Sequence, residues 1–235
     1  MSDSLKEHLY AVREQIAEAA KKAGRSPAEV KLLAVSKTFP AEDILQVFNY
    51  GQIEFGENRV QELETKVPVL PEEICWHLIG HLQSNKAEKA VALAEFIHSV
   101  DSVKLLRKIE TAAEKRDKIQ KILLEVNVSG EESKYGIGGY EALREIAEEA
   151  VKLDHVKLFG LMTMAPLGAD EAVLHTVFGG LRTFRDRLQK EFGIQLPELS
   201  MGMSGDFEDA IAEGATQVRV GTALFGARPP MRANG

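Results

Sequence analysis

The sequence predicts a parallel (β/α)8 barrel of the TIM type, preceded by an extra N-terminal helix, as a single domain over residues 1–235. Short runs of β-branched or apolar residues alternate with amphipathic helical stretches, as in folds built on a parallel sheet. No long linker or low-complexity segment interrupts them. A chain of 235 residues also suits one such barrel, which commonly has roughly 250. An open, doubly wound sheet is the structural alternative.

The first element is a helix predicted over residues 5–23. Its apolar residues recur at helical spacing: Leu5, Leu9, Val12, Ile16 and Ala19. Because this helix precedes the first strand, we expect it to cover the bottom or the side of the barrel.

Eight strands follow, predicted at residues 31–36, 52–55, 76–79, 96–99, 121–127, 157–162, 198–201 and 217–220. Helices are predicted at 41–49, 102–116, 140–152 and 171–192. The functional residues of a (β/α)8 barrel lie just after its strands, at one mouth. The polar or glycine positions expected there are Lys37, Glu57, Asn58, His81, Gln83, Asn127, Ser129, Thr163, Ser204, Gly221 and Thr222.

Composition excludes several classes of function. Hydrophobic residues make up 44% and charged residues 28% of the chain, and the formal net charge is −7. This acidic balance argues against a broad nucleic-acid surface, which needs clustered positive charge. The N-terminus lacks a secretory signal and no apolar stretch is long enough for a bilayer, so a cytoplasmic protein is expected. The single cysteine, Cys75, is interpreted as a packing residue rather than a nucleophile.

Lys37 comes directly after the apolar run LLAVS, at the end of the first predicted strand. Burial disfavours an ammonium and lowers its pKa, and only the neutral amine attacks an aldehyde. The alternative is a lysine that extends its charge into solvent. The residue alone leaves both interpretations open.

Two glycine-containing segments, SMGMSGD (200–206) and RVGTALFG (219–226), each lead from a strand into a turn and a helical start. The turns after strands seven and eight form the common phosphate site of this architecture. Backbone amides at helix starts bind anions, and Ser204 and Thr222 add hydroxyl donors. The alternative is two ordinary turns, with Asp206 as an N-cap. A reactive amine and an anion site together suit pyridoxal 5'-phosphate, which carries an aldehyde and a phosphate.

The sequence is similar to the pyridoxal phosphate homeostasis protein family, single-domain relatives of the alanine racemase barrel. Seven blocks in the family's order carry the resemblance: LLAVSKTFP (32–40), FGENRVQE (55–62), WHLIGHLQSNK (76–86), SKYGI (133–137), GLMTM (160–164), SMGMSGDFEDAI (200–211) and QVRVGTALFGAR (217–228). The blocks are spread along the chain, and the resemblance extends over nearly all of it.

The resemblance implies that Lys37 forms the Schiff base with the cofactor. It also implies roles for Ser204, Gly221 and Thr222 at the phosphate, for Asn58 and His81 near the ring, and for Arg219 at the pyridine nitrogen. Met201 is assigned to the cofactor site as well, although core packing also explains it. No residue is assigned as catalytic or as a metal ligand. His77 and His81 lie four residues apart, but they lack the intervening Glu of helical zinc motifs.

The expected function is binding of pyridoxal phosphate in intracellular homeostasis, as a carrier or buffer of the cofactor. A cationic Arg219 disfavours protonation of the pyridine nitrogen, which weakens the ring as an electron sink. Only nine residues follow Gly226, which leaves no room for the racemase's second domain. The alternatives are a pyridoxal phosphate-dependent racemase or decarboxylase, and a barrel that binds another phosphorylated metabolite. Expected partners are the cofactor and apo-enzymes that depend on it, and a monomer is expected.

Overall fold

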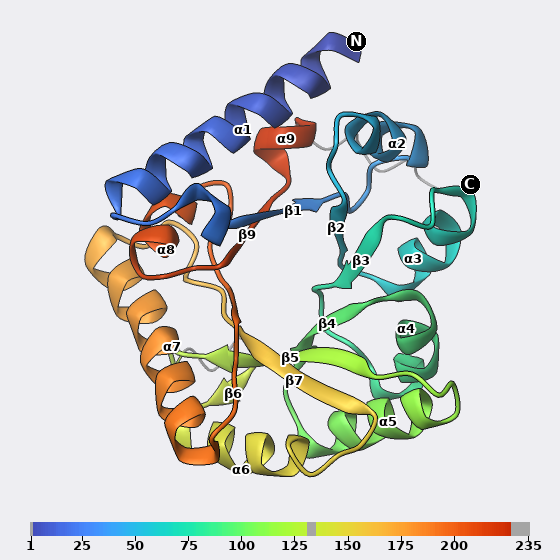
Figure 1. The fold of residues 1–235 in the computed structure, drawn as a ribbon, viewed down its shortest axis with the longest axis vertical. Coiled ribbons are helices and arrows are strands. Elements are labelled where there is room, and N and C mark those ends of the chain that lie inside the picture. Colours follow the sequence, from blue (N-terminus) through green and yellow to red (C-terminus); the bar gives the residue numbers. More distant parts are fainter. Residues whose placement is uncertain (1, 131–134, 227–235) are drawn as a thin grey trace.

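The computed structural model describes residues 2–130 and 135–226. Within them, eight parallel strands close into a barrel surrounded by helices (Figure 1). The strands run in the order β4-β3-β2-β1-β9-β8-β7-β5, and pairing of β4 with β5 closes the ring. The predicted barrel is therefore confirmed, and the open sheet is excluded. The barrel strands are β1 (Lys31–Val35), β2 (Glu54–Glu57), β3 (Cys75–Leu78), β4 (Phe96–Val100), β5 (Gln120–Asn127), β7 (Val156–Met162), β8 (Glu198–Ser200) and β9 (Gln217–Val220).

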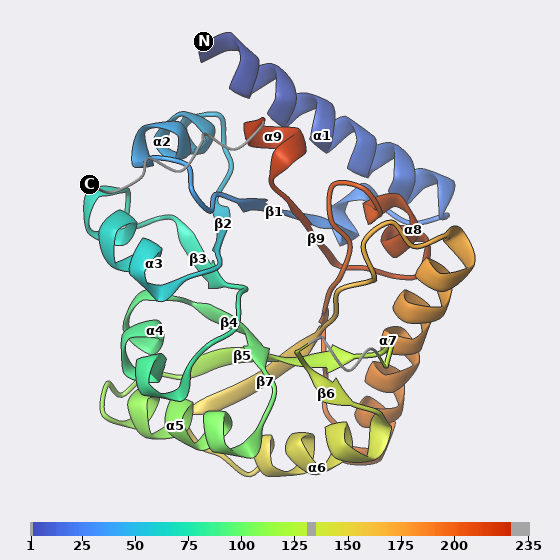
Figure 2. The same cartoon turned by 180° about the vertical axis from the view of Figure 1, so that it is seen from behind.

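Helices cover the outside of the barrel in sequence order (Figure 2). The short strand β6 (Ile137–Gly138), which was not predicted, adds to the end of β5. The short helices α3 and α4 were not predicted either, since seven residues carry little periodic signal. The helices are α1 (Ser2–Lys22), α2 (Ala41–Asn49), α3 (Val60–Lys66), α4 (Ala87–Leu93), α5 (Val103–Glu114), α6 (Tyr140–Ala150), α7 (Glu171–Phe192), α8 (Phe207–Ala212) and α9 (Thr222–Phe225), with 3-10 turns at Pro27–Glu29, Val67–Val69 and Ser84–Lys86.

The N-terminal helix α1 lies along the side of the barrel, against α2, α8 and α9 (Figure 1). The five apolar residues that predicted it are all buried, from Leu5 to Ala19. The His8 ring also hydrogen-bonds the Leu224 carbonyl at 3.1 Å, between α1 and α9. The helix thus joins the beginning of the chain to the last helix of the described part.

The second strand lies two residues later than predicted, at Glu54–Glu57 instead of 52–55. Ile53 is exposed, and the Gln52 side chain donates to the Leu32 carbonyl at 2.7 Å. Gly56 fits this strand because it has no side chain to place inside the crowded barrel. A Cβ at this position would lie only 3.2 Å from Leu33. Glu57 is therefore the last residue of β2 and does not follow it.

The barrel has two different faces. Outward-facing residues such as Leu32 and Ala34 belong to one hydrophobic cluster beneath the helices. The interior is more polar at its base, where Lys31 pairs with Glu198 at 2.7 Å. Alternation along each parallel strand produces this division.

Among the described helices, none is long and apolar enough to cross a membrane.

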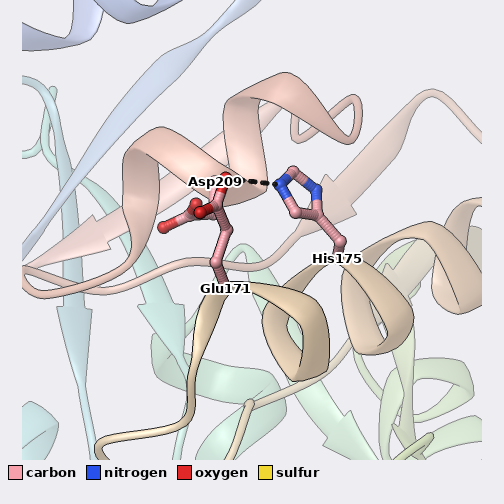
Figure 3. A group of neighbouring side chains, drawn as sticks. All are labelled: Glu171, His175 and Asp209. Atoms are coloured by element: carbon pink, nitrogen blue, oxygen red, sulfur yellow. Dashed lines mark ion pairs between the residues drawn. The ribbon is translucent and has the colours of Figure 1, made fainter.

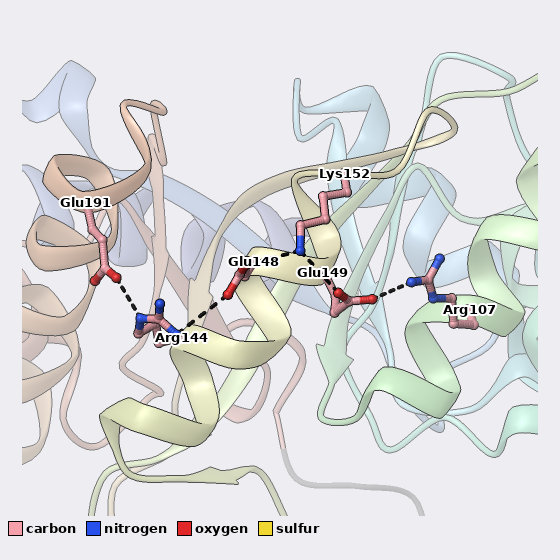
Figure 4. A network of polar contacts seen from close by, with 6 residues as sticks. All are labelled: Arg107, Arg144, Glu148, Glu149, Lys152 and Glu191. Atoms are coloured by element: carbon pink, nitrogen blue, oxygen red, sulfur yellow. Dashed lines mark hydrogen bonds and ion pairs between the residues drawn. The ribbon is translucent and has the colours of Figure 1, made fainter.

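An ion-pair network connects α5, α6 and α7 on the outer surface (Figure 4). Arg144 pairs with Glu191 at 2.6 Å, and Arg107 pairs with Glu149. The charged residues of α6, which was predicted as a helix over 140–152, are the centre of this network. Each exposed pair contributes little to stability by itself. The six residues are Arg107, Arg144, Glu148, Glu149, Lys152 and Glu191.

A substitution at Gly160 tests how closely β7 and β8 pack. A Cβ at this position would lie 1.9 Å from the Glu198 carbonyl oxygen, so Gly160→Ala must push two strands apart. We expect a loss of about 3 kcal/mol in the free energy of unfolding, measured by urea denaturation. The matched control is Gly138→Ala in β6, where a Cβ meets nothing within 4 Å. A change of less than about 1 kcal/mol is expected there, and equal effects would contradict the assigned spacing.

Candidate functional site

The barrel mouth is the end at which all eight parallel strands terminate. The structure places most of the predicted site residues there, because each follows a strand. Lys37 lies two residues after β1, Asn58 directly follows β2, and His81 lies three residues after β3. Ser204 follows β8, and Gly221 and Thr222 follow β9. The motif positions 133–134 and 227–228 lie outside the described residues.

Lys37 is half-buried at this mouth. The ladder continues one residue past β1, because the Ser36 amide donates to the Gly56 carbonyl at 3.0 Å. Leu33 and Val35 are buried apart from the outer hydrophobic cluster, so they face the barrel interior. The same alternation directs Lys37 toward the inside. The position therefore suits an amine that reacts inside the mouth.

Gly221 brings the turn after β9 close to β1. A Cβ at this position would lie 3.2 Å from the Val35 carbonyl oxygen and 3.4 Å from its Cβ. Because Gly221 has no side chain, its backbone can lie close to Val35, two residues before Lys37 in the sequence. Thr222 and Ala223 begin α9, where backbone amides have no acceptor within the helix. These amides are therefore available as donors at the turn beside β1.

The turn over residues 203–206 offers two more donors. Its ends are fixed, because the Met203 amide donates to Asp206 Oδ1 at 2.5 Å and the Phe207 amide donates to the Met203 carbonyl at 2.9 Å. Across residues 2–130 and 135–226, the amides of Ser204 and Gly205 donate to no protein acceptor. Asp206 is the N-cap residue of α8, as in the alternative interpretation of this segment, but its side chain accepts from the Met203 amide and does not cap the helix.

Arg219 is a buried cation below the mouth, with 4% of its surface exposed. It donates to Ser200 Oγ at 2.8 Å and to the Thr163 carbonyl at 2.9 Å. Burial lowers the pKa of Arg219 to about 10, while Asp206 and Glu125 oppose that shift. The guanidinium therefore remains charged at neutral pH and cannot accept a proton or a hydrogen bond.

A chain of hydrogen bonds extends from Arg219 through the barrel interior. His98 Nδ1 lies 3.1 Å from Ser200 Oγ, and His98 Nε2 lies 2.9 Å from His77 Nδ1. Burial lowers the pKa of His77 to about 3 and the pKa of His98 well below its usual range. These lowered pKa values keep both rings neutral at neutral pH, so His98 contacts the hydroxyl that accepts from Arg219, and His77 contacts His98, without adding charge. This interior polar chain was not predicted from the sequence.

Asn58 and His81 line a cavity of about 650 Å³ beside the mouth. Asn58 Oδ1 is buried and has no hydrogen-bond partner among the described residues. His81 is more exposed, stacks on Tyr135 with ring centroids 4.3 Å apart, and lies 3.7 Å from Asp101. Buried polar atoms are normally paired, so Asn58 Oδ1 is a position where a ligand donor fits.

Some predicted residues lie elsewhere. The Met201 side chain is fully buried in the outer hydrophobic cluster, as the packing interpretation requires, and is not brought to the mouth. Glu57 is also fully buried and pairs with Lys66 at 2.6 Å behind the mouth. The sequence reasoning missed Glu125, which is buried on β5 and whose pKa is raised to about 7 by burial and by Asp101. Its signal was a carboxylate within the apolar run ILLEV.

Other candidate chemistry is weaker. Burial raises the pKa of Cys75 to about 11, which supports packing over a nucleophilic thiolate. His77 lies inside the barrel and His81 at its rim, so they do not form a metal pair. Figure 3 shows Glu171, His175 and Asp209 on neighbouring helices. Their potential ligand atoms lie within 4.8 Å of one another. Ion pairs already explain His175, which lies 2.9 Å from Glu213 and 3.6 Å from Glu171.

Comparison with known proteins agrees with this geometry. The family described as "Alanine racemase, N-terminal domain" matches residues 8–229. The "Pyridoxal phosphate homeostasis protein" of Aquifex aeolicus (strain VF5) is 45% identical over 94% of this chain and 97% of its own. PipY of Synechococcus elongatus PCC7942, solved with PLP bound, is 41% identical, with a TM-score of 0.84 over 94% of this chain and 100% of its own.

Alanine racemase from Clostridium difficile 630, solved in complex with cycloserine, shares the fold at 17% identity. Its TM-score is 0.75 over 97% of this chain and 61% of the racemase chain. The resemblance inferred from the sequence blocks is confirmed. On the family match and on identities above 30% across nearly the full length, this chain belongs to the pyridoxal phosphate homeostasis protein family, built on the alanine racemase N-terminal domain fold.

Proposed function

We propose that this chain binds pyridoxal 5'-phosphate at the barrel mouth and acts in homeostasis of that cofactor, holding it through Lys37. One observation carries the proposal. A half-buried lysine after β1 lies beside the Gly221 turn, above a buried arginine. A relative that is 41% identical over its full length has been solved with PLP bound. The cofactor site is thus proposed from position and chemistry together.

The residues at the mouth fit this group. The amides of Ser204 and Gly205, which have no protein acceptor in the described ranges, suit the phosphate. Thr222 adds a hydroxyl at the neighbouring turn, where Gly221 leaves space beside Val35. Asn58 would supply its orphaned Oδ1 near the ring. His81 is proposed as a neighbour at the rim, and Met201 only as the packed support of the turn that it precedes.

Arg219 limits the chemistry available at the site. When bound, pyridoxal phosphate acts as an electron sink whose strength depends on protonation of its ring nitrogen. Arg219 donates both of its described hydrogen bonds to protein oxygens and remains cationic at neutral pH. A fixed positive charge disfavours a second positive charge beside it. The proposed site therefore favours holding the cofactor over stabilising a carbanion.

Carriage of the cofactor is accordingly preferred to turnover of a substrate. The relative from Aquifex aeolicus (strain VF5), at 45% identity, is named for homeostasis of pyridoxal phosphate and not for a reaction. The proposed partners are apo-enzymes that take up the cofactor, and the protein is proposed to act as a monomer. A racemase or decarboxylase is the second candidate, because the alanine racemase barrel has the same fold.

Removal of Lys37 tests the attachment. The purified protein incubated with pyridoxal phosphate should absorb in the visible range, and borohydride should fix the cofactor to the peptide that contains Lys37. Lys37→Ala should lose both signals, because no neutral amine remains at that position. Peptide mapping by mass spectrometry is the measurement. Unchanged colour in Lys37→Ala, with Lys31→Ala as the matched control, would count against the proposal.

The phosphate cradle predicts selectivity between two ligands. Ser204→Ala and Thr222→Ala should each weaken binding of pyridoxal phosphate about tenfold, since hydrogen bonds to charged groups contribute about 1.5–3 kcal/mol. Binding of pyridoxal, which lacks the phosphate, should hardly change. Fluorescence titration of both ligands measures the difference. An equal loss for both ligands would place these hydroxyls away from the phosphate.

Turnover is tested separately. A carrier should leave the α-proton of amino acids in place, whereas a racemase exchanges it with solvent. We expect no exchange above the rate of free pyridoxal phosphate when the loaded protein is incubated with amino acids in deuterium oxide and followed by NMR. Rapid exchange for any single amino acid, lost in Lys37→Ala, would establish the second candidate.

A further inference from the structure

A buried group of charges lies directly behind the segment that carries Lys37. It consists of Glu57 at the end of β2 and of Glu62 and Lys66 on α3. Glu57 is fully buried and Lys66 is 7% exposed. Lys66 Nζ lies 2.6 Å from Glu57 Oε1 and 2.9 Å from Glu62 Oε2. We call these three residues the charged cluster.

The charged cluster contacts the backbone on both sides of Lys37. On one side, Lys66 Nζ donates to the Ser36 carbonyl at 3.0 Å, and Ser36 Oγ donates to Glu57 Oε1 at 2.7 Å. On the other side, the Thr38 amide donates to Glu62 Oε2 at 2.7 Å. Three hydrogen bonds from one cluster therefore bracket a single residue. That residue is the lysine to which the cofactor is proposed to bind.

The bracketed segment adopts a conformation that its sequence disfavours. Thr38 has φ of 71°, in the left-handed region that β-branched residues rarely occupy. Such a conformation persists only where surrounding contacts determine it. Two described hydrogen bonds hold it: the Thr38 amide donates to Glu62 Oε2 at 2.7 Å, and the Phe39 amide donates to the Ser36 carbonyl at 3.1 Å.

Stability alone is a poor reason for burying these charges. Desolvation of an ion pair commonly offsets its attraction, and apolar residues of similar volume often serve equally well. Burial raises the pKa of Glu57 to about 7 despite the neighbouring Lys66 ammonium. Glu57 Oε2 also has no partner within the described chain. A costly, incompletely satisfied cluster that contacts one short segment indicates a role in that segment's geometry.

We propose that Glu57, Glu62 and Lys66 are positioning residues, which fix the backbone around Lys37 so that its amine points into the mouth. This inference rests on the proposed function, in which Lys37 holds the cofactor. It also gives a role to two carboxylates of the FGENRVQE block: Glu57, which is buried behind the mouth, and Glu62, which accepts from the Thr38 amide. The cluster acts on the lysine and does not touch the ligand.

Glu62→Ala is the sharpest variant, because it removes the acceptor for the Thr38 amide and leaves the Glu57–Lys66 pair. Glu62→Gln keeps an acceptor oxygen and should restore most of the effect. The matched control is Glu64→Ala on the same helix, which removes a carboxylate that pairs only with Lys89 at 2.6 Å in the described structure. A second test variant, Glu57→Gln with Lys66→Met, removes both of the most buried charges at similar volume and leaves the partly exposed Glu62 with the Thr38 amide.

Two ligands separate positioning from general damage. Pyridoxal phosphate can bond to Lys37, whereas pyridoxine 5'-phosphate has the phosphate but no aldehyde. Glu62→Ala should weaken binding of pyridoxal phosphate about tenfold and leave binding of pyridoxine phosphate within twofold. The double variant should do the same, and Glu64→Ala should change neither. Equal losses for both ligands, or equal effects of Glu62→Ala and Glu64→Ala, would overturn the proposal.

Hydrogen exchange in the cofactor-free protein supplies an independent readout. The Thr38 amide should exchange at least tenfold faster in Glu62→Ala than in the parent protein, with Glu62→Gln in between. Unchanged exchange would overturn the bracketing role, whatever the ligand data show. If the parent protein does not bond pyridoxal phosphate at Lys37, the proposed function fails, and the exchange result still decides whether the cluster fixes the segment.

Discussion

The pairing of β1 with β9 is the constraint on which the mouth depends. It joins the first strand to the last, with Leu33 opposite Arg219 and Ala34 opposite Val220. Lys37 and Gly221 are 184 residues apart in the sequence, yet this ladder brings their turns close together. Closure by the β4–β5 pair then fixes the remaining strand ends around them. A site assembled from distant segments therefore requires the complete barrel.

The interior of the barrel differs from the branched aliphatic filling common in this architecture. Arg219, Ser200, His98 and His77 form a connected polar chain below the mouth. Its members are buried, and the histidines are neutral at physiological pH because burial lowers their pKa. Each polar atom in such a chain limits the orientation of the next. The guanidinium of Arg219, the single permanent charge in this chain of hydrogen bonds, is consequently held at a fixed position.

Two layers of support thus surround one lysine. From inside the barrel, the polar chain fixes a cation beneath the mouth. From outside, the charged cluster of Glu57, Glu62 and Lys66 holds the backbone on either side of Lys37. Precise placement of a reactive group commonly needs support of this kind. The arrangement explains why charged residues are buried on both sides of β1 and β2.

Local sequence patterns determined much of the fold and of the candidate site. Alternating strand and helix patterns were sufficient for the barrel and for α1, and the positions after strands placed Lys37, Asn58, Ser204 and Gly221 at one end. Such features depend on a few adjacent residues, which is why they can be read from the chain. Register was harder, because Gly56 weakens the strand pattern while its missing side chain fits the barrel interior.

Only the tertiary structure decided which side chains meet. Glu57 follows the pattern of a mouth residue, but the pleat turns it outward to Lys66. Met201 belongs to a site-like motif, yet alternation places its side chain in the outer core. The hydrogen-bond partners of Arg219 are Ser200 on β8 and Thr163 directly after β7, and no spacing in the sequence indicates them. The sequence determined where the chain turns. Closure of the barrel determined what surrounds each turn, because contacts between strands depend on their register and on which side of the sheet each side chain faces.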